Sequence, residues 1–112
     1  MKLLSWTLLA AVALQADAAN ADEALAKARN CAACHTANKK LYGPTYREIA
    51  QKYANRKDAE AQIAAAIIKG TPMPSGLGWQ KAGSATLPFM PPSAGVKPEE
   101  AARLAKWILA TK

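Results

Sequence analysis

Residues 31–35 of the chain read Cys31-Ala32-Ala33-Cys34-His35, and this pentapeptide decides how the rest is interpreted. Two cysteines three positions apart, followed at once by a histidine, are the pattern of c-type haem attachment. Each thiol adds across one vinyl group of the porphyrin, so both sulfurs must reach the same side of one helical turn. The imidazole then binds the iron from one face of the ring. Because His35 is the only histidine in the chain, it is the predicted proximal ligand.

Three other interpretations of the cysteine pair are weaker. A thioredoxin-like redox pair expects a βαβ context, and the sequence has no strand pattern. A structural zinc site takes four Cys or His ligands, whereas the chain has two cysteines and one histidine. A disulfide across one helical turn closes too short a loop to stabilise a fold appreciably. Haem attachment is therefore the favoured prediction.

The N-terminal segment has the pattern of an export signal. Lys2 gives it a positive start, residues 3–14 are mostly apolar, and residues 16–18 form a small-x-small cleavage site. The apolar run is too short for a comfortable transmembrane helix. We predict a signal peptide over residues 1–18, with cleavage after residue 21 or an uncleaved anchor as alternatives. Residues 19–112 are then one small domain in the periplasm.

The remaining chain carries helical periodicity without a strand pattern, so an all-α fold is expected. The predicted helices cover residues 22–32, 45–54, 59–69 and 98–111. In the first, Leu25, Ala28 and Ala32 should form one apolar stripe. Asp58 should cap the third helix, and Gly70 should end it. The inward faces of the later helices are predicted to be Tyr46, Ile49 and Tyr53; Ile63, Ala66 and Ile67; and Ala101, Leu104, Ala105 and Ile108, with Trp107 beside them.

Residues 71–95 contain five of the seven prolines, which excludes a long helix or strand there. An irregular segment of this length is unusual in a small domain unless it is functional, and covering one face of a haem would be such a function. Two methionines near its ends, Met73 and Met90, could bind the iron opposite His35, although core packing is the commoner role of methionine. Position in the chain favours Met90; Met73, a lysine or an open iron are the alternatives.

The chain also resembles the small bacterial class I cytochromes c, which carry a single haem with histidine and methionine ligands. The matching segments are residues 31–35, 42–46 (Tyr-Gly-Pro-Thr-Tyr), 89–92 (Phe-Met-Pro-Pro) and 104–109 (Leu-Ala-Lys-Trp-Ile-Leu), in the order of the family. The resemblance implies the class I cytochrome c fold, with about four helices around one covalently attached haem c. It departs from the short members of the family between Gly70 and Met90, where this chain is about ten residues longer.

The resemblance also implies the roles of individual residues. Met90 becomes the distal iron ligand, and the backbone carbonyl of Pro44 accepts a hydrogen bond from the ligand histidine, which raises its basicity. Trp79 is the candidate for a hydrogen bond to a haem propionate, although the longer loop makes its alignment ambiguous. The full predicted set is Cys31 and Cys34 as thioethers, His35 and Met90 as axial ligands, and Pro44 and Trp79 beside the haem.

These features predict an electron carrier and not an enzyme, because two protein ligands close the iron to substrate while the haem supplies the redox chemistry. The formal net charge of +7 predicts redox partners with acidic docking patches. Nucleic-acid binding is not expected of an exported haem protein, and neither is stable membrane insertion after cleavage; the predicted state is a monomer. The alternatives are a haem enzyme or gas sensor with a labile sixth ligand, and an electron-input subunit of a larger periplasmic oxidoreductase, for example in sulfur oxidation.

Overall fold

A computed structural model describes residues 21–39, 41–71, 89–93 and 95–111. Helix covers residues 21–28, η1 is a 3₁₀ turn over Cys31–Ala33, and the longer helices are α2 (Tyr46–Tyr53), α3 (Ala59–Lys69) and α5 (Pro98–Leu109). Within these residues the only strand-like pairing is one isolated bridge, which confirms the predicted all-α class. None of the described helices is long and apolar enough to cross a membrane.

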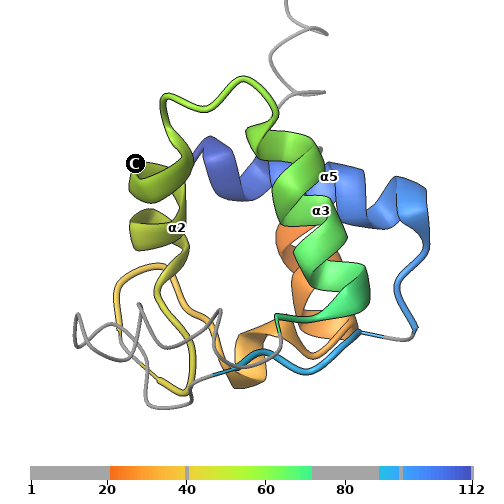
Figure 1. Cartoon of the computed structure of the whole chain (residues 1–112). Helices are drawn as coiled ribbons and strands as arrows, with labels where there is room; N and C mark the ends of the chain where they lie inside the picture. Colours follow the sequence, from red (N-terminus) through yellow and green to blue (C-terminus); the bar gives the residue numbers. More distant parts are fainter. Residues whose placement is uncertain (1–20, 40, 72–88, 94, 112) are drawn as a thin grey trace, which may run out of the picture.

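Helix α5 is the element against which the others pack. It contacts both α2 and α3, and in Figure 1 it passes behind α3 and ends beside α2. Its inward face is the predicted one, and Ala101 and Ala105 are fully buried there, while Leu104 is 1 % exposed. Because Ala101 and Ala105 have small side chains, the backbone of neighbouring elements can approach α5 closely. Ile63 and Ile67 of α3 belong to the same hydrophobic core, as expected from their spacing.

The expected apolar stripe of the first helix is correct for Leu25, which packs against the core, and wrong for its other two residues. Ala28 and Ala32 are exposed, and the buried residue is Ala26 at 2 % exposure. The helix ends at residue 28, and Asn30 adopts a left-handed conformation (φ 65°) that redirects the chain before η1. The residues that contact α5 or the core from this segment are Asp22 and Ala26 of the helix and Arg29 of the turn after it, spaced four and three apart. Two of these three residues are charged, so a search for apolar spacing alone passes over them.

Helix α2 begins where its sequence can satisfy the free N–H groups of a first turn. Thr45 Oγ1 accepts a hydrogen bond from the backbone N–H of Glu48, and the Glu48 carboxylate accepts one from the N–H of Thr45, both at 3.1 Å. This reciprocal pair is the capping box that a Thr-x-x-Glu sequence favours. It fixes the start of α2 one residue after Pro44, which matters for the site below.

Helix α3 has the predicted bounds, but its N-terminus is not capped as expected. Asp58 occupies the N-cap position, yet its side chain makes no hydrogen bond to the backbone there. Its Oδ2 instead accepts from the side-chain amide of Gln62 at 3.1 Å. The reason is the backbone of Asp58 (φ −105°, ψ 26°), which is not the extended conformation that directs a capping side chain at the first turn. Gly70 ends the helix as predicted, with φ +76° and its N–H donating to the Ala66 carbonyl at 2.8 Å.

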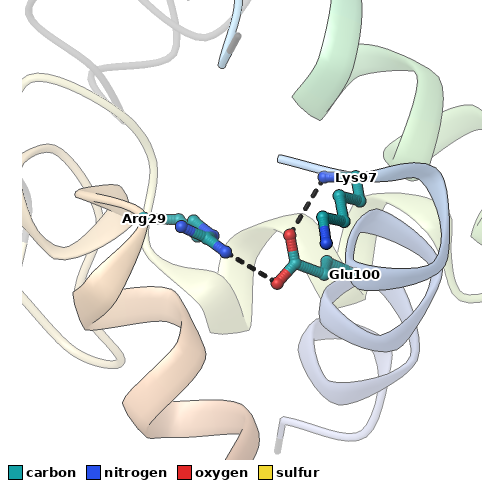
Figure 2. A network of polar contacts seen from close by, with 3 residues as sticks. All are labelled: Arg29, Lys97 and Glu100. Carbon is teal, nitrogen blue, oxygen red and sulfur yellow. Dashed lines mark hydrogen bonds and ion pairs between the residues drawn. The ribbon is translucent and has the colours of Figure 1, made fainter. Parts of the chain in front are cut away.

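Two ion pairs connect the first helical segment to α5. Arg103 Nη2 lies 2.8 Å from Asp22 Oδ1, and Arg29 Nη2 lies 2.9 Å from Glu100 Oε2. Figure 2 shows the second pair, in which the other oxygen of Glu100 accepts from the backbone N–H of Lys97 at 3.0 Å. Glu100 thus both caps the start of α5 and binds the preceding part of the chain.

This network predicts a specific loss of stability in acid. The hydrogen bond from Arg29, followed by that from the Lys97 backbone, lowers the pKa of Glu100 below its ordinary value of 4.5. A lowered folded-state pKa stabilises the fold fully above the unfolded value, and this contribution disappears as the pH falls through the folded value. Glu100→Gln should therefore show a shallower decline of the thermal unfolding midpoint below about pH 4.5 than the unmodified protein.

The matched control is Glu99→Gln, because Glu99 is an exposed residue in the same first turn of α5. It removes an equal charge next to the helix N-terminus and should leave the steep acid decline in place. Parallel curves for Glu100→Gln and the unmodified protein would show that the network does not couple folding to pH. Thermal unfolding followed by circular dichroism at closely spaced pH values measures all three proteins.

Candidate functional site

An apolar cleft lies among the pentapeptide, α2, α3, α5 and segment 89–93. It encloses about 970 Å³, its solvent-open mouth included, and its lining is mostly apolar. Cys31, Cys34 and His35 border it together with Pro44 and Met90. The fold thus gathers two thiols, one imidazole and one thioether from segments up to 59 residues apart in sequence.

His35 is buried, and its orientation is set by one short contact. Its Nδ1 lies 2.6 Å from the carbonyl oxygen of Pro44. A carbonyl can only accept, so Nδ1 carries the proton and donates, which leaves the lone pair on Nε2. Burial lowers the pKa of His35, while the bond to Pro44 opposes this shift, so the ring is neutral at neutral pH. A neutral imidazole with Nδ1 engaged is the form that binds a metal through Nε2.

The turn before α2 is hydrogen-bonded back onto the pentapeptide. The N–H of Gly43 donates to the carbonyl of Cys34 at 3.0 Å, and the N–H of Tyr46 donates to the carbonyl of Thr36 at 2.8 Å. The Tyr46 ring stacks beside the His35 imidazole, with centroids 5.8 Å apart and planes inclined by 30°. These contacts and the Pro44 bond leave the imidazole little freedom to rotate.

The two thiols sit on one tight turn. Within η1 the N–H of Cys34 donates to the carbonyl of Cys31 at 3.1 Å, and the N–H of His35 donates to the same oxygen at 2.9 Å. Both cysteines are free thiols that border the cleft and are partly buried. Burial raises the pKa of the Cys31 thiol, which disfavours the thiolate that a redox or nucleophilic cysteine needs.

Met90 is positioned by the only bridge among the described residues. The N–H of Thr71 donates to the Met90 carbonyl at 2.8 Å, and the N–H of Met90 lies 3.1 Å from the Thr71 carbonyl and 2.9 Å from Thr71 Oγ1. Two residues beyond Pro91, the N–H of Ser93 donates to the Ile67 carbonyl at 3.0 Å. The partly buried Met90 is thus fixed at the C-terminal end of α3, bordering the cleft.

The cleft brings together five of the six predicted site residues. Trp79, and Met73 as the alternative ligand, lie outside the described residues. The sequence reasoning did not assign Gly43, Gly70 or Thr71 to the site, and it did not foresee the contact of Tyr46 with His35. A Gly-Pro dipeptide and the Thr-x-x-Glu capping pattern mark the turn around Pro44, so part of this could have been found. The pairing of Thr71 with Met90 spans 19 residues and has no local signal.

The residues present fit a covalently attached haem. A flat, largely apolar macrocycle with an iron centre requires an apolar cleft, two thiols close together on one turn and a nitrogen ligand at the wall of the cleft, and all three occur here. Gly43 adds a steric indication, because a Cβ there would lie 2.5 Å from His35 Cε1. The imidazole of His35 thus packs directly against the backbone of Gly43. This fold and donor set define a c-type haem protein.

Comparison with known proteins agrees with this assignment to the c-type haem proteins. The family model described as cytochrome c matches residues 19–112. The chain is 44 % identical over 94 residues to cytochrome c2 of Rhodocyclus tenuis, covering 82 % of this chain and 95 % of that protein. It is 41 % identical over 106 residues to cytochrome c-552 of Nitrosomonas europaea, covering 95 % and 93 %. The chain belongs to the cytochrome c family, as a class I c-type cytochrome with one covalently bound haem c.

A solved structure extends the likeness to the fold. The crystal structure of wild-type Nitrosomonas europaea cytochrome c552 superposes with a TM-score of 0.67 at 37 % identity, covering 80 % of this chain and 99 % of that one. Both the resemblance and the fold predicted from the sequence are thereby confirmed.

One polar group in the core gives a prediction for stability. The Tyr46 hydroxyl is buried and has no hydrogen-bond partner among the described residues, and burial raises the pKa of this phenol. A buried hydroxyl without a partner costs about 1–3 kcal/mol of desolvation. Tyr46→Phe keeps the ring contacts with His35 and Trp107 and should raise the free energy of unfolding by about 1 kcal/mol.

Urea unfolding of the haem-loaded protein measures this effect. The companion variant Tyr46→Leu also removes the hydroxyl but loses the ring contacts, so it should be less stable than Tyr46→Phe. A loss of more than about 1 kcal/mol in Tyr46→Phe would mean that the hydroxyl is hydrogen-bonded in the folded, haem-loaded protein.

Proposed function

We propose that this protein is an exported one-electron carrier that shuttles electrons between redox partners in a respiratory chain. The observation that carries the proposal is the placement of the His35 imidazole and Met90 in one apolar cleft, each on backbone fixed by hydrogen bonds. When bound, the haem supplies a reversible one-electron change at its iron. The chain contributes the rest of the function, because it positions the haem, buries it and surrounds it with charged side chains.

Each site residue has a distinct part in this proposal. Cys31 and Cys34 would hold the porphyrin as thioethers, and His35 through Nε2 and Met90 through Sδ would bind the iron. The Pro44 carbonyl fixes the ring of His35 and raises its basicity. Trp79 remains the proposed partner of a haem propionate.

Two protein ligands support a carrier over an enzyme. Once His35 and Met90 both bind the iron, no position on it would remain for a substrate. The thioether favours the reduced state and so raises the reduction potential relative to two nitrogen ligands. Because His35 and Met90 are held by backbone contacts on separate segments, neither needs to move when an electron arrives.

The proposed location is the periplasm. Residues 1–18 are the proposed signal peptide and residues 19–112 the mature haem domain, although residues 1–20 lie outside the described part. The intact mass of the protein purified from its expression host tests this boundary. It should equal residues 19–112 plus one haem, or begin after residue 21; a mass that retains residues 1–18 would identify an anchor.

The proposed partners are redox proteins with acidic docking patches. Exposed basic side chains are numerous on the described surface, and they include Lys39, Arg47, Lys52, Arg56, Lys57 and Lys69. Such a surface steers acidic partners, and the association rate falls as salt screens the charges. The chain is proposed to act as a monomer without nucleic-acid or membrane partners.

Absorption spectra of both oxidation states, with and without carbon monoxide, test the carrier proposal. The reduced protein should be unchanged by carbon monoxide at neutral pH, because Met90 keeps the sixth position. Strong binding would identify a haem enzyme or gas sensor instead. A partner that stays bound through purification would identify an electron-input subunit of a larger complex.

A further inference from the structure

The two proposed axial residues share an unusual structural feature: each lies against a glycine that has no room for a side chain. A Cβ on Gly43 would lie 2.5 Å from His35 Cε1 and 2.9 Å from its Nδ1. A Cβ on Gly70 would lie 2.5 Å from the Met90 carbonyl oxygen and 2.8 Å from the Pro92 nitrogen. Gly95 is the contrast, since a Cβ there would meet nothing within 4 Å.

We infer that Gly43, and Gly70 together with Thr71, are positioning residues that set the two axial iron bonds from opposite ends of the site. The inference rests on the proposed function, which assigns His35 and Met90 as the ligands. Gly43 acts on the ring of His35, and the Gly70–Thr71 pair acts on the backbone of Met90.

The Gly43 backbone cannot retreat from an added methyl group. Its N–H is bonded to the Cys34 carbonyl at 3.0 Å, and the next residue, Pro44, accepts the 2.6 Å bond from His35 Nδ1. On another side of the imidazole lies the stacked Tyr46 ring. A methyl group on Gly43 therefore tilts the imidazole or breaks its bond to Pro44, and both outcomes change the proximal iron bond.

Gly70 is constrained in a different way. Its φ of +76° and ψ of 178° lie in a region that is essentially restricted to glycine. The atoms that its Cβ would meet are backbone atoms of Met90, Pro91 and Pro92, and proline rings stiffen that segment. The bridge from Thr71 to Met90 transmits any shift directly to the proposed ligand.

Three alanine variants of the haem-loaded protein test the inference. Gly70→Ala should weaken the far-red charge-transfer band of the oxidised protein and tighten the binding of added imidazole, which competes with Met90, by about tenfold or more. Gly43→Ala should keep that band but speed exchange of the His35 Nδ1 proton, followed by NMR in the reduced protein, by about tenfold. Gly95→Ala should match the unmodified protein in every measurement.

A Met90→Ala variant in the same series separates the inference from the proposed function. If Met90→Ala keeps the far-red band, the ligand assignment is wrong and the inference falls with it. If Met90→Ala loses the band while Gly70→Ala and Gly43→Ala behave like Gly95→Ala, the ligands are correct and only the positioning role is overturned.

A milder change covers the case in which Gly70→Ala does not fold. Thr71→Val leaves the backbone of Gly70 untouched and removes only the hydroxyl that accepts from the Met90 N–H at 2.9 Å. It should tighten imidazole binding about threefold, because the Met90 backbone loses one of its hydrogen bonds. Imidazole binding equal to that of the unmodified protein would overturn the assignment for the distal side.

Discussion

Replacing Met90 with alanine should abolish the far-red charge-transfer band of the oxidised protein and open the reduced iron to carbon monoxide. The band requires a thioether sulfur on ferric iron, and Met90 is the described methionine that borders the cleft. Removing the competing thioether should raise the apparent affinity for carbon monoxide by at least about a hundredfold. The reduction potential should fall, because the soft ligand that favours the reduced state is lost.

Met73→Ala is the matched control, since Met73 also stands before a proline in the same irregular segment. It should keep the band, and the absorption spectrum of its reduced form should not change when carbon monoxide is added. Loss of the band in Met73→Ala and its retention in Met90→Ala would exchange the two assignments. Retention in both variants would point to a ligand other than methionine. Absorption spectra of oxidised and reduced protein, with carbon monoxide added to the latter, suffice for all comparisons.

Much of the fold could be predicted because its signals are local. The bounds of α3 were predicted correctly, since Gly70 marks the end by a conformation that other residues avoid. The inward face of α5 was also correct, because four apolar residues at helical spacing can only be buried together. The pentapeptide required nothing beyond its own spacing.

The errors arise where a local pattern depends on a distant partner. Asp22 of the first helix and Arg29 just after it are partly buried, and their positions are explained by their ion pairs with Arg103 and Glu100 of α5. Asp58 has the right residue type for a cap, but its backbone dihedrals, set by the preceding turn, direct its side chain to Gln62. Residue type alone determines neither outcome.

The site residues also fall into those with a local sequence signal and those whose position depends on a distant contact. Residues alone identify Cys31, Cys34 and His35, because one turn contains them all. They left Met73 and Met90 both open, since the position of a methionine at the end of a long irregular segment depends on what the chain pairs with. The pairing of Thr71 with Met90 and the close approach of Gly70 place the backbone of Met90 beside the cleft, whereas Met73 lies outside the described residues.

Leu104→Ala should cause the largest loss of stability among changes in the helical core. Leu104 is 1 % exposed, is the largest fully buried side chain among the described residues, and borders the cleft from α5. Truncating such a leucine removes its transfer free energy and leaves a cavity, at a cost of about 2–5 kcal/mol. Native domains are stable by only about 5–15 kcal/mol, so the variant should lose a large part of its stability. Urea unfolding of the haem-loaded protein, with the slope m compared between variants, measures the loss.

Leu109→Ala provides the comparison, because Leu109 ends the same helix and is only partly buried. Its loss should be about 1 kcal/mol. Both variants should keep the far-red band while folded, since His35 is oriented by Pro44 and Met90 by Thr71, and neither contact involves α5. Equal losses in the two variants would show that the haem, and not the packing of α5, supplies most of the folding free energy. Loss of the band in folded Leu104→Ala would show instead that α5 takes part in positioning an axial ligand.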